Sequence, residues 1–437
     1  MMLMMTATVK RLAMTAEQLP RDLAGWLARI EACHPAEIEL GLDRLQQVAQ
    51  RLPLDLSRTC KIVIGGTNGK GSTLTMLDAI LRDAGYVTGS YTSPHFLHYN
   101  ERVCISGQPV DDATLCEAFS LIEHVRGATP LTYFEYGTLA ALLIFSQRQV
   151  DVALLEVGLG GRLDAVNIVD ADIAMVTTVA LDHTDWLGPD RESIGREKAG
   201  IFRAGKPALC GDAAPPATLV EHAHQLGAPL QIQSVDFSYR REGDVWHWQG
   251  PNTRLNELPV PVLPLPNAAL VLAALQFFPS PVPEQSIRSG FASARLKGRM
   301  QTVRLGQVEA VVDVAHNPEA AEYLSNWLES RPCEGQTHLV LGMLADKDIE
   351  TVIQTLVPVV DVWHPISLRV PRGADRERLQ SALEAAGVPQ DRIRGADSVA
   401  AAIEQLQSMP STDRLMVAGS FFTVAQALEL AEQDTAS

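Results

Sequence analysis

Residues 61–85, KIVIGGTNGKGSTLTMLDAILRDAG, decide the fold of the N-terminal half of the chain. The apolar run 61–66 predicts a short buried strand. Apolar residues from Leu74 to Leu81 then recur at helical spacing, and Gly85 supplies a natural helix end. The glycine-rich turn between them lets backbone N–H groups approach phosphate oxygens without Cβ clashes, and the helix N-terminus adds a positive dipole. The stretch therefore predicts an α/β sheet with a phosphate site at one edge.

The turn itself supplies the groups that phosphate binding needs. It consists of Gly65, Gly66, Thr67, Asn68, Gly69, Lys70, Gly71 and Ser72. Lys70 offers a charge for the terminal phosphates, and a hydroxyl at the helix start can hold Mg²⁺. The spacing departs from the usual G-x-x-x-x-G-K-[ST] because Gly71 separates Lys70 from Ser72. We favour phosphate binding over the alternative, a tight structural turn with a surface lysine.

Other apolar runs extend the α/β pattern on both sides of a different middle region. Near-continuous runs at 150–157 and 172–181 are typical of parallel strands covered on both faces, and they favour a doubly wound sheet. A second strand–helix series begins near residue 300. Strands are predicted within 308–318, 337–344 and 414–420, and a helix is predicted at 348–360. Asn317 is a natural N-cap, and Pro318 is a natural first residue of the helix that follows. Between the two series, residues 234–250 alternate between apolar and polar types, which predicts a β-hairpin with a turn around residues 242–244. The proline-dense residues 257–266 predict an extended strand, and residues 268–278 predict a helix.

Length and charge limit the classes of protein. A chain of 437 residues fits two domains or three, and we place the main boundary near 296–298, giving domains 1–296 and 297–437. The net charge of −16 argues against a general nucleic-acid or anionic-membrane binder, but it does not exclude small anionic ligands. The six cysteines form no C-x-x-C pair, so free thiols are expected. With no long apolar run and no signal-peptide pattern at the start, a cytoplasmic location is expected.

A carboxylate ends one of the predicted buried strands. Glu156 follows the apolar residues 150–155, where open α/β sheets place their ligands. A buried carboxylate is costly unless it is paired or binds a cation. An ion pair with Arg162 is the alternative, but the phosphate loop at the same edge favours a Mg²⁺ ligand.

Further candidates are weaker on the residues alone. His183, after the third strand, is equally compatible with a structural role and a metal-ligand role. Lys198 lies in a predicted helix with solvated charges, and nothing else singles it out. Arg299 and Asp313 in the second series can reach phosphates and ribose hydroxyls, although capping or ion pairing is equally plausible. Two such domains would place the ligands in an interdomain cleft.

Seven motifs together resemble one family. They are GTNGKGS (66–72), YTSPH (91–95), LTYFEYGT (131–138), EVGLGGRLDA (156–165), ALDHTDWLG (180–188), REKAGIF (196–202) and DVAHNP (313–318). With these segments in this order, the chain resembles bacterial folylpolyglutamate synthase/dihydrofolate synthase of the ATP-dependent Mur ligase superfamily. The resemblance extends from about residue 40 to residue 420, and the interrupted loop spacing is this family's own form. It implies an N-terminal P-loop ATPase-type domain with a small added β region and a C-terminal Rossmann-like α/β domain.

The resemblance implies roles for individual residues. ATP would be bound by Thr67, Asn68, Gly69, Lys70, Gly71, Ser72, Asn267, Arg299 and Asp313. Two Mg²⁺ ions are implied, one held by Ser93 and Glu156 and the other by His183. Lys198 matches a lysine that can be carbamylated to N6-carboxylysine, and with Lys70, Glu156 and His183 it would make up the catalytic set.

The resemblance also implies the reaction. Dihydropteroate-binding segments match Leu40, Gly41, Leu42, Asp43, Thr132, Tyr133, Phe134, Glu135, Leu163, Asp164 and Ala165. The implied enzyme is a monomer that adds L-glutamate to 7,8-dihydropteroate and then extends reduced folates, through an acyl phosphate made with ATP. The alternatives are another Mur-type amino-acid ligase, against which LTYFEYGT argues, and a non-catalytic ATP-binding regulator.

Overall fold

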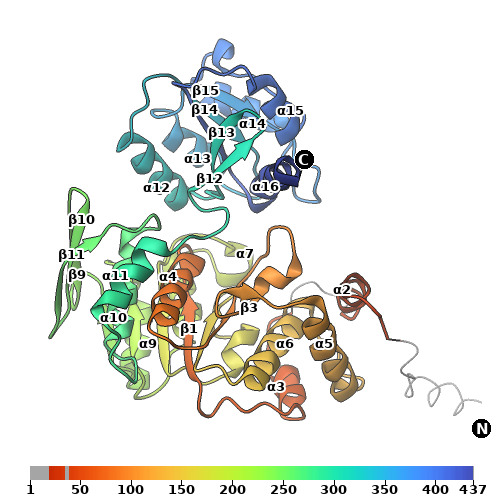
Figure 1. Cartoon of the computed structure of the whole chain (residues 1–437), viewed down its shortest axis with the longest axis vertical. Helices are drawn as coiled ribbons and strands as arrows, with labels where there is room; N and C mark the ends of the chain where they lie inside the picture. The colour runs from red at the N-terminus through yellow and green to blue at the C-terminus, as the bar shows by residue number, and fades with distance from the viewer. Residues whose placement is uncertain (1–18, 35–38, 437) are drawn as a thin grey trace, which may run out of the picture. The chain divides into compact units, whose positions relative to one another are not determined.

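The computed structural model describes residues 19–34 and 39–436. The chain divides into two compact units. Unit 1 comprises Met1–His95 and Asn100–Ala294, and unit 2 comprises Phe96–Tyr99 and Arg295–Ser437. Both units are α/β in construction, as predicted (Figure 1).

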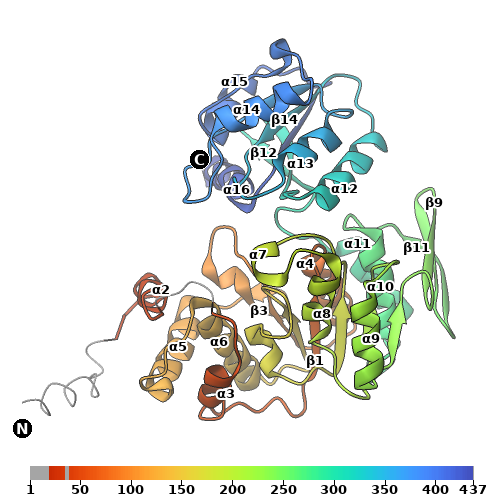
Figure 2. The same ribbon diagram turned by 180° about the vertical axis from the view of Figure 1, so that it is seen from behind.

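Unit 1 is built on an eight-stranded sheet with the order β4-β3-β2-β5-β1-β6-β7-β8. Its strands are β1 Cys60–Gly65, β2 Thr88–Tyr91, β3 Val103–Ile105, β4 Gln108–Pro109, β5 Val152–Glu156, β6 Ile173–Val176, β7 Ala208–Cys210 and β8 Leu230–Ile232. The central strands pair in parallel, and only β3 and β4 at one margin run antiparallel to their neighbours. Because helices lie on both sides of the sheet (Figures 1 and 2), β5 and β6 are buried along their whole length.

Two helices of unit 1 precede the sheet, and the others lie singly or in pairs between and after its strands. The helices are α2 Leu23–Glu31, α3 Asp43–Ala49, α4 Lys70–Asp83, α5 Asp112–Arg126, α6 Tyr133–Arg148, α7 Thr184–Leu187, α8 Arg191–Ala199, α9 Ala217–Leu226, α10 Leu265–Leu275 and α11 Glu284–Ser293, with 3₁₀ turns η2 Tyr99–Arg102 and η3 Ala165–Ile168. The predicted helix at the phosphate loop begins at Lys70, two residues before Ser72. None of the helices in the described residues is long and apolar enough to cross a bilayer.

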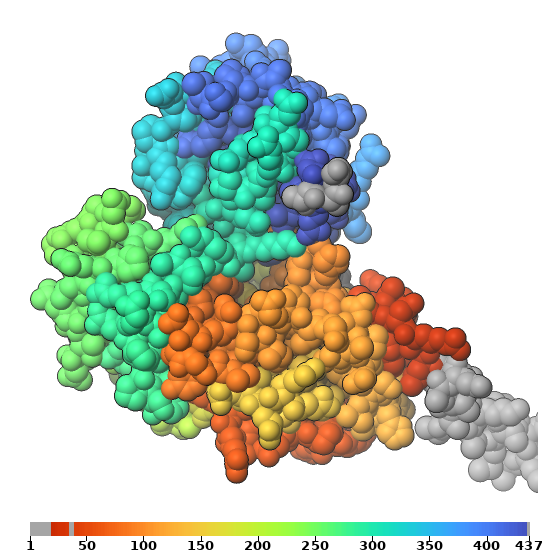
Figure 3. Space-filling model, in the orientation of Figure 1, coloured from red at the N-terminus to blue at the C-terminus, as the bar shows by residue number. Residues whose placement is uncertain are grey.

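A small antiparallel sheet lies at the margin of unit 1 (Figures 1 and 3). It contains β9 Ser238–Glu242, β10 Val245–Gln249 and β11 Arg254–Pro259, which confirms the predicted hairpin with its turn at Gly243. Trp248 fixes this sheet on α10, because its indole Nε1 donates to Ala269 O at 3.0 Å. The prediction of an extended strand over 257–266 was only half right: β11 ends at Pro259 and α10 begins at Leu265, where Pro266 is tolerated in the first turn.

Unit 2 contains a five-stranded sheet with the order β12-β13-β16-β14-β15. Its elements are β12 Gln301–Leu305, β13 Val308–Asp313, α12 Pro318–Glu329, β14 Thr337–Leu341, α13 Ile349–Leu356, β15 Val362–Pro365, α14 Arg376–Ala385, η4 Gln390–Arg392, α15 Val399–Leu406, β16 Arg414–Ala418 and α16 Phe421–Ala436. All strands except β12 pair in parallel. The predicted cap is confirmed: the Asn317 side chain accepts from Ala320 N at 3.0 Å, and Pro318 is the first helical residue.

The core of unit 2 has two layers, one on each face of the sheet. Leu339 and Leu341 of β14 pack with α12, α13 and α14, whereas Val340 between them packs with α15 and α16. This alternation follows from the two-residue period of a strand, and it makes the sheet apolar on both sides. All six cysteines of the chain are free thiols, as predicted.

Two histidines are buried against each other in unit 2. His338 of β14 and His364 of β15 are 3 % and 1 % exposed, and Nδ1 of His338 lies 3.2 Å from Nε2 of His364. The opposite nitrogen of His338 lies 3.3 Å from Asp413 Oδ2. Burial first, and then the neighbouring charges of His338 and Arg394, lower the pKa of His364 to about 4. The pair is therefore neutral in the folded protein at pH 7.

This pair predicts acid-sensitive stability. Because the pKa of His364 is lower in the folded state than the ordinary 6.5, its contribution to stability is full above pH 6.5 and is lost as the pH falls towards 4. The free energy of unfolding in urea should fall by about 2 kcal/mol more between pH 7.5 and pH 5 in the wild type than in His364→Leu. The exposed His224→Leu is the control and should keep the wild-type pH dependence. Equal pH dependence in wild type and His364→Leu would contradict the prediction.

Candidate active site

The phosphate loop between β1 and α4 is held in a conformation that only glycine adopts at two positions. Gly66 has φ 139° and Gly69 has φ 85°. A Cβ on Gly66 would lie 1.8 Å from Thr177 Oγ1, and one on Gly69 would lie 2.5 Å from Asn267 Nδ2. The second contact also places Asn267 of α10, a predicted ATP ligand, directly against the loop.

The loop is fixed by hydrogen bonds to the chain that leaves β6. Thr67 N donates to Thr178 O at 2.8 Å, and Asn68 N donates to Thr178 Oγ1 at 3.2 Å. The Thr67 hydroxyl donates to Ala180 O and accepts from Ala180 N, at 3.2 and 3.0 Å. The prediction of a strand over 172–181 was therefore wrong beyond Val176, because these residues bond the loop instead of a neighbouring strand. The loop is pre-shaped for a ligand.

Lys70 and Ser72 lie where α4 begins. The ammonium of Lys70 donates to Gly66 O and Thr67 O, each at 3.0 Å, so it lies over the loop. Ser72 is 4 % exposed in the first turn of the helix. An ammonium and a helix N-terminus are thus gathered in one place, an arrangement that suits a phosphate group.

Glu156 and Ser93 meet beside the loop because of the sheet register. Glu156 ends β5 and pairs with Ile64 of β1. On the other side of β5, Tyr91 of β2 pairs with Leu155, so Ser93 follows just beyond the strand end. Ser93 N donates to Glu156 Oε2 at 3.1 Å. Arg162, the alternative partner of Glu156, instead binds Glu197, with Nη2 2.8 Å from Oε1.

These donors fit a divalent cation that also binds phosphate. Glu156 is a buried carboxylate, 6 % exposed, that accepts from the backbone N–H of Ser93 at the strand end beside the phosphate loop. Among residues 19–34 and 39–436, no three His, Cys, Asp or Glu side chains gather as a metal site. Carboxylate and hydroxyl oxygens are ligands that Mg²⁺ accepts together with substrate phosphates, so Glu156 and Ser93 could hold this ion beside the phosphate loop.

His183 and Lys198 are placed in different environments. His183 lies after β6 in the left-handed region, φ 53°, and its side chain is 47 % exposed. Lys198 of α8 is 3 % exposed. The loop after β5 lies on α8, because a Cβ on Gly161 would be 2.8 Å from Glu197 O and 3.1 Å from Lys198 Cα. Their roles as metal ligand and carbamylated lysine stay predictions.

Asp164, in one of the predicted acceptor segments, joins the loop after β5 to the start of η3. Its carboxylate, 4 % exposed, accepts from the backbone N–H groups of Gly158, Leu159 and Val166 at 3.0, 2.9 and 2.9 Å. Burial raises the pKa of Asp164 to about 6, against the lowering effect of these bonds and of the positive charge of Lys70. Only the family resemblance, and no local sequence pattern, marked Asp164 as a candidate site residue.

The three predicted acceptor segments come together in unit 1. Leu40–Asp43 lead into α3, Thr132–Glu135 begin α6, and Leu163–Ala165 lead into η3, which packs on both helices. Thr132 and Glu135 form a capping box at the start of α6. Phe134 packs on Gly158, where a Cβ would lie 2.7 Å from the ring. Tyr133 lies under the guanidinium of Arg102, 5.5 Å from the ring centroid.

Arg299 and Asp313 lie in unit 2. Asp313 ends β13, and its carboxylate accepts from Met300 N at 3.0 Å and from Ala315 N at 2.9 Å. These bonds join the end of β13 to the residues before β12 and after β13, and the role of Asp313 in ribose binding stays a prediction. Arg299 stacks over Phe421, 5.0 Å from the ring centroid.

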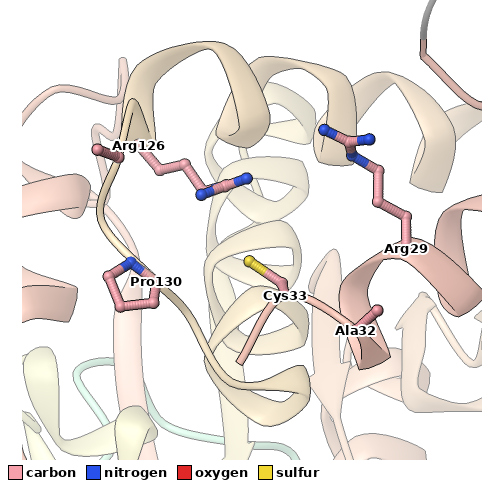
Figure 4. A pocket seen from close by; sticks show the side chains of 6 residues that line it. Arg29, Ala32, Cys33, Arg126 and Pro130 are labelled. Carbon is pink, nitrogen blue, oxygen red and sulfur yellow. The ribbon is translucent and has the colours of Figure 1, made fainter. Parts of the chain in front are cut away.

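A cavity of about 480 Å³ lies away from the predicted site residues. Arg126 and Pro130 lie on one side of it, and Arg29 and Ala32 on the other (Figure 4). Both arginines bind the Glu123 carboxylate, with nitrogen–oxygen distances of 2.6 and 2.7 Å. This ion-pair network holds α2 against α5, so we assign it a structural role.

Sequence reasoning missed the residues that support the site from behind. Thr177 and Thr178 hold the phosphate loop, and Arg44 contacts Glu135 of one acceptor segment and Glu39, the residue just before another. The sequence offers two signals for these residues. Thr177 and Thr178 are two hydroxyl side chains near the end of an apolar run, and Arg44 directly follows Leu40–Asp43.

Comparison with known proteins identifies the family. The Mur ligase middle domain matches residues 64–210, and the Mur ligase glutamate ligase domain matches residues 298–421. The dihydrofolate synthase/folylpolyglutamate synthase of Escherichia coli K12 is 47 % identical over 414 residues, covering 94 % of this chain and 96 % of that protein. The chain belongs to the dihydrofolate synthase/folylpolyglutamate synthase family.

Solved structures of this family share the whole fold. The Escherichia coli FolC complex with DHPP and ADP matches with a TM-score of 0.88 at 46 % identity, covering 95 % of this chain and 98 % of that one. A bifunctional folylpolyglutamate synthase/dihydrofolate synthase with Mn, AMPPNP and L-glutamate bound matches with a TM-score of 0.85 at 45 % identity, covering 94 % and 99 %. These matches confirm the fold expected for the family, with an N-terminal parallel sheet of the nucleotide-binding type and a C-terminal Rossmann-like α/β domain.

The loop geometry predicts that Gly66→Ala weakens nucleotide binding. A Cβ 1.8 Å from Thr177 Oγ1 must displace the loop, so the Kd for AMPPNP measured by calorimetry should rise at least about tenfold. Gly85→Ala is the matched control, since Gly85 also has a positive φ, 90°, but has nothing within 4 Å of the added Cβ. It should lose about 1 kcal/mol of stability and keep its nucleotide affinity. Unchanged affinity in Gly66→Ala would refute the steric argument.

Proposed function

We propose that the protein is an ATP-dependent ligase that joins L-glutamate to 7,8-dihydropteroate to form dihydrofolate, and that it extends reduced folates with further glutamates. The observation that carries this is 47 % identity to the Escherichia coli dihydrofolate synthase/folylpolyglutamate synthase over nearly the whole chain. The preformed phosphate loop with the Glu156–Ser93 pair supports it, because that geometry suits a metal–nucleotide complex.

The chemistry requires an activated acid. A carboxylate oxygen of the acceptor attacks the γ-phosphorus of ATP, the bond to ADP breaks, and an acyl phosphate forms. The glutamate amine then attacks the acyl carbon, phosphate leaves with the C–O bond electrons, and the nitrogen loses a proton to give the amide. No protein nucleophile is needed, so the residues act by position and charge.

The residues of unit 1 divide this work. Lys70 and the loop N–H groups offset the charge on the transferred phosphoryl group. Glu156 and Ser93 would hold Mg²⁺, which when bound neutralises phosphate charge and orients the γ-phosphate. We propose that His183 serves a second ion and that Lys198, once carbamylated, gives a carboxylate-like group to support it.

The remaining site assignments follow the same proposal. Residues 1–296 bind ATP and the pterin acceptor, and residues 297–437 form the glutamate ligase domain, with Arg299 and Asp313 serving ATP. We propose a cytoplasmic monomer that binds no nucleic acid or membrane, in keeping with the net charge of −16.

The direct test is turnover. Purified protein with Mg²⁺, ATP, dihydropteroate and L-glutamate should release phosphate and form dihydrofolate in equal amounts, and tetrahydrofolate should replace dihydropteroate as acceptor. Nucleotide binding without acceptor-dependent phosphate release would instead identify a non-catalytic regulator. Turnover with a peptidoglycan precursor alone would identify another Mur-type ligase.

Lys70→Ala should lose activity and keep its fold. The Lys70 ammonium donates to Gly66 O and Thr67 O in a surface loop and not to the apolar core, so the melting temperature should change little. The kcat should fall at least about 10²-fold, because the positive charge that offsets the developing charge on the transferred phosphoryl group is removed. Lys206→Ala, at an exposed ion pair with Asp172, is the control and should keep full activity. Loss of soluble protein in Lys70→Ala would show that the lysine is structural.

Glu156→Gln should change the metal requirement. Gln keeps the acceptor for Ser93 N but removes the negative charge, so the Mg²⁺ concentration for half-maximal activity should rise at least about tenfold. Activity titrated with Mg²⁺ at saturating ATP checks this. An unchanged Mg²⁺ dependence would place the metal elsewhere.

A further inference from the structure

We propose that Arg44 is a positioning residue for the acceptor, and that it does this by tying the segment before α3 to the start of α6. The inference rests on the proposed function, since residues 40–43 and 132–135 are taken to hold the pterin acid.

Arg44 uses two edges of its guanidinium for two different segments. On one edge, Nε donates to Glu135 Oε2 at 3.2 Å and Nη2 lies 3.0 Å from Glu135 Oε1. On the other edge, Nη2 donates to Glu39 O at 2.7 Å and Nη1 donates to Glu39 Oε1. A planar fork with five N–H groups can make both sets of contacts at once, and an ammonium cannot.

The partner in α6 is itself part of the acceptor site. Glu135 is 3 % exposed, and its Oε2 also accepts from Thr132 N at 2.8 Å. The Glu135 carboxylate therefore fixes the start of α6 and receives Arg44 with the same group. The segment that Arg44 holds is placed relative to Thr132–Glu135 and not merely kept folded.

The segment before α3 is held at Glu39 by two side chains, since besides Arg44 the His34 Nε2 lies 2.7 Å from Glu39 Oε2. Residues 40–43 after it show weak local order. Leu42 is the N-cap of α3 and provides no side-chain cap, and Gly41 has φ 152°. α3 is only seven residues long, so its own hydrogen bonds contribute little order to the residues before it. The contacts of Arg44 with Glu39 place residues 40–43, which lie between the two partners in sequence.

The role can be tested with a substitution that keeps the charge. Arg44→Lys retains a cation beside the buried Glu135, so the protein should fold, but it cannot span both segments. The KM for dihydropteroate should rise about tenfold, while the KM for ATP and kcat at saturating acceptor stay within about twofold. The matched control is Arg51→Lys, an arginine just after the same helix that donates to a single carbonyl, Val125 O, and it should behave as wild type.

A second variant guards against a folding artefact. Glu39→Ala removes the side-chain contact with Arg44 Nη1 and the ion pair with His34, and it keeps the bond from Arg44 Nη2 to Glu39 O. Because the Glu39 side chain is 50 % exposed, the variant should fold, and it should raise the same KM by less than Arg44→Lys does. If both substitutions disrupt the same connection, the KM for dihydropteroate of the double variant should be only slightly higher than that of the single variant with the higher KM.

The outcomes separate the two ideas. An active wild type whose Arg44→Lys variant keeps its dihydropteroate KM, or raises the KM for ATP equally, would overturn the positioning role alone. An inactive wild type would overturn the proposed function.

Discussion

A steric constraint at the end of β1 governs the site. Gly66 and Gly69 are held where no side chain fits, with Thr177 behind one and Asn267 behind the other. Packing from the next strand and from α10 therefore sets the loop, and the loop sets where α4 begins and where Lys70 lies. Thr178 adds to this constraint, because the N–H groups of Thr67 and Asn68 donate to it and so fix the shape of the loop.

Parallel pairing places the remaining groups around that loop. Since β5 lies between β1 and β2, its last residue, Glu156, emerges beside the loop on one side and beside Ser93 on the other. A shift of one residue in either pairing would turn the carboxylate to the other face of the sheet. The metal–phosphate chemistry thus depends on strand register, and register depends on the apolar residues buried along β5.

Local pattern predicted most of the fold, and long-range contacts account for what it missed. The apolar runs located the central strands, and the Asn317-Pro318 pair located a helix start, because both signals are local. The run 172–181 was read as one strand, but its end bonds the loop about 110 residues earlier, which no periodicity reveals. Local pattern likewise could not predict that Arg162 pairs with Glu197 or that Arg44 pairs with Glu135, because these partners lie on elements distant in sequence.

Charge at the site is balanced locally, which reconciles anionic substrates with an acidic chain. Asp164 is buried, yet three backbone N–H groups and the charge of Lys70 keep its pKa near 6, so most molecules carry the carboxylate at pH 7. Without phosphate, Asp164 offsets part of the Lys70 charge. When an anionic nucleotide arrives, it competes for that lysine and meets a loop whose N–H groups are already oriented. The net charge of −16 therefore does not predict the electrostatic potential at the phosphate loop, because charges that are close and buried contribute most to it.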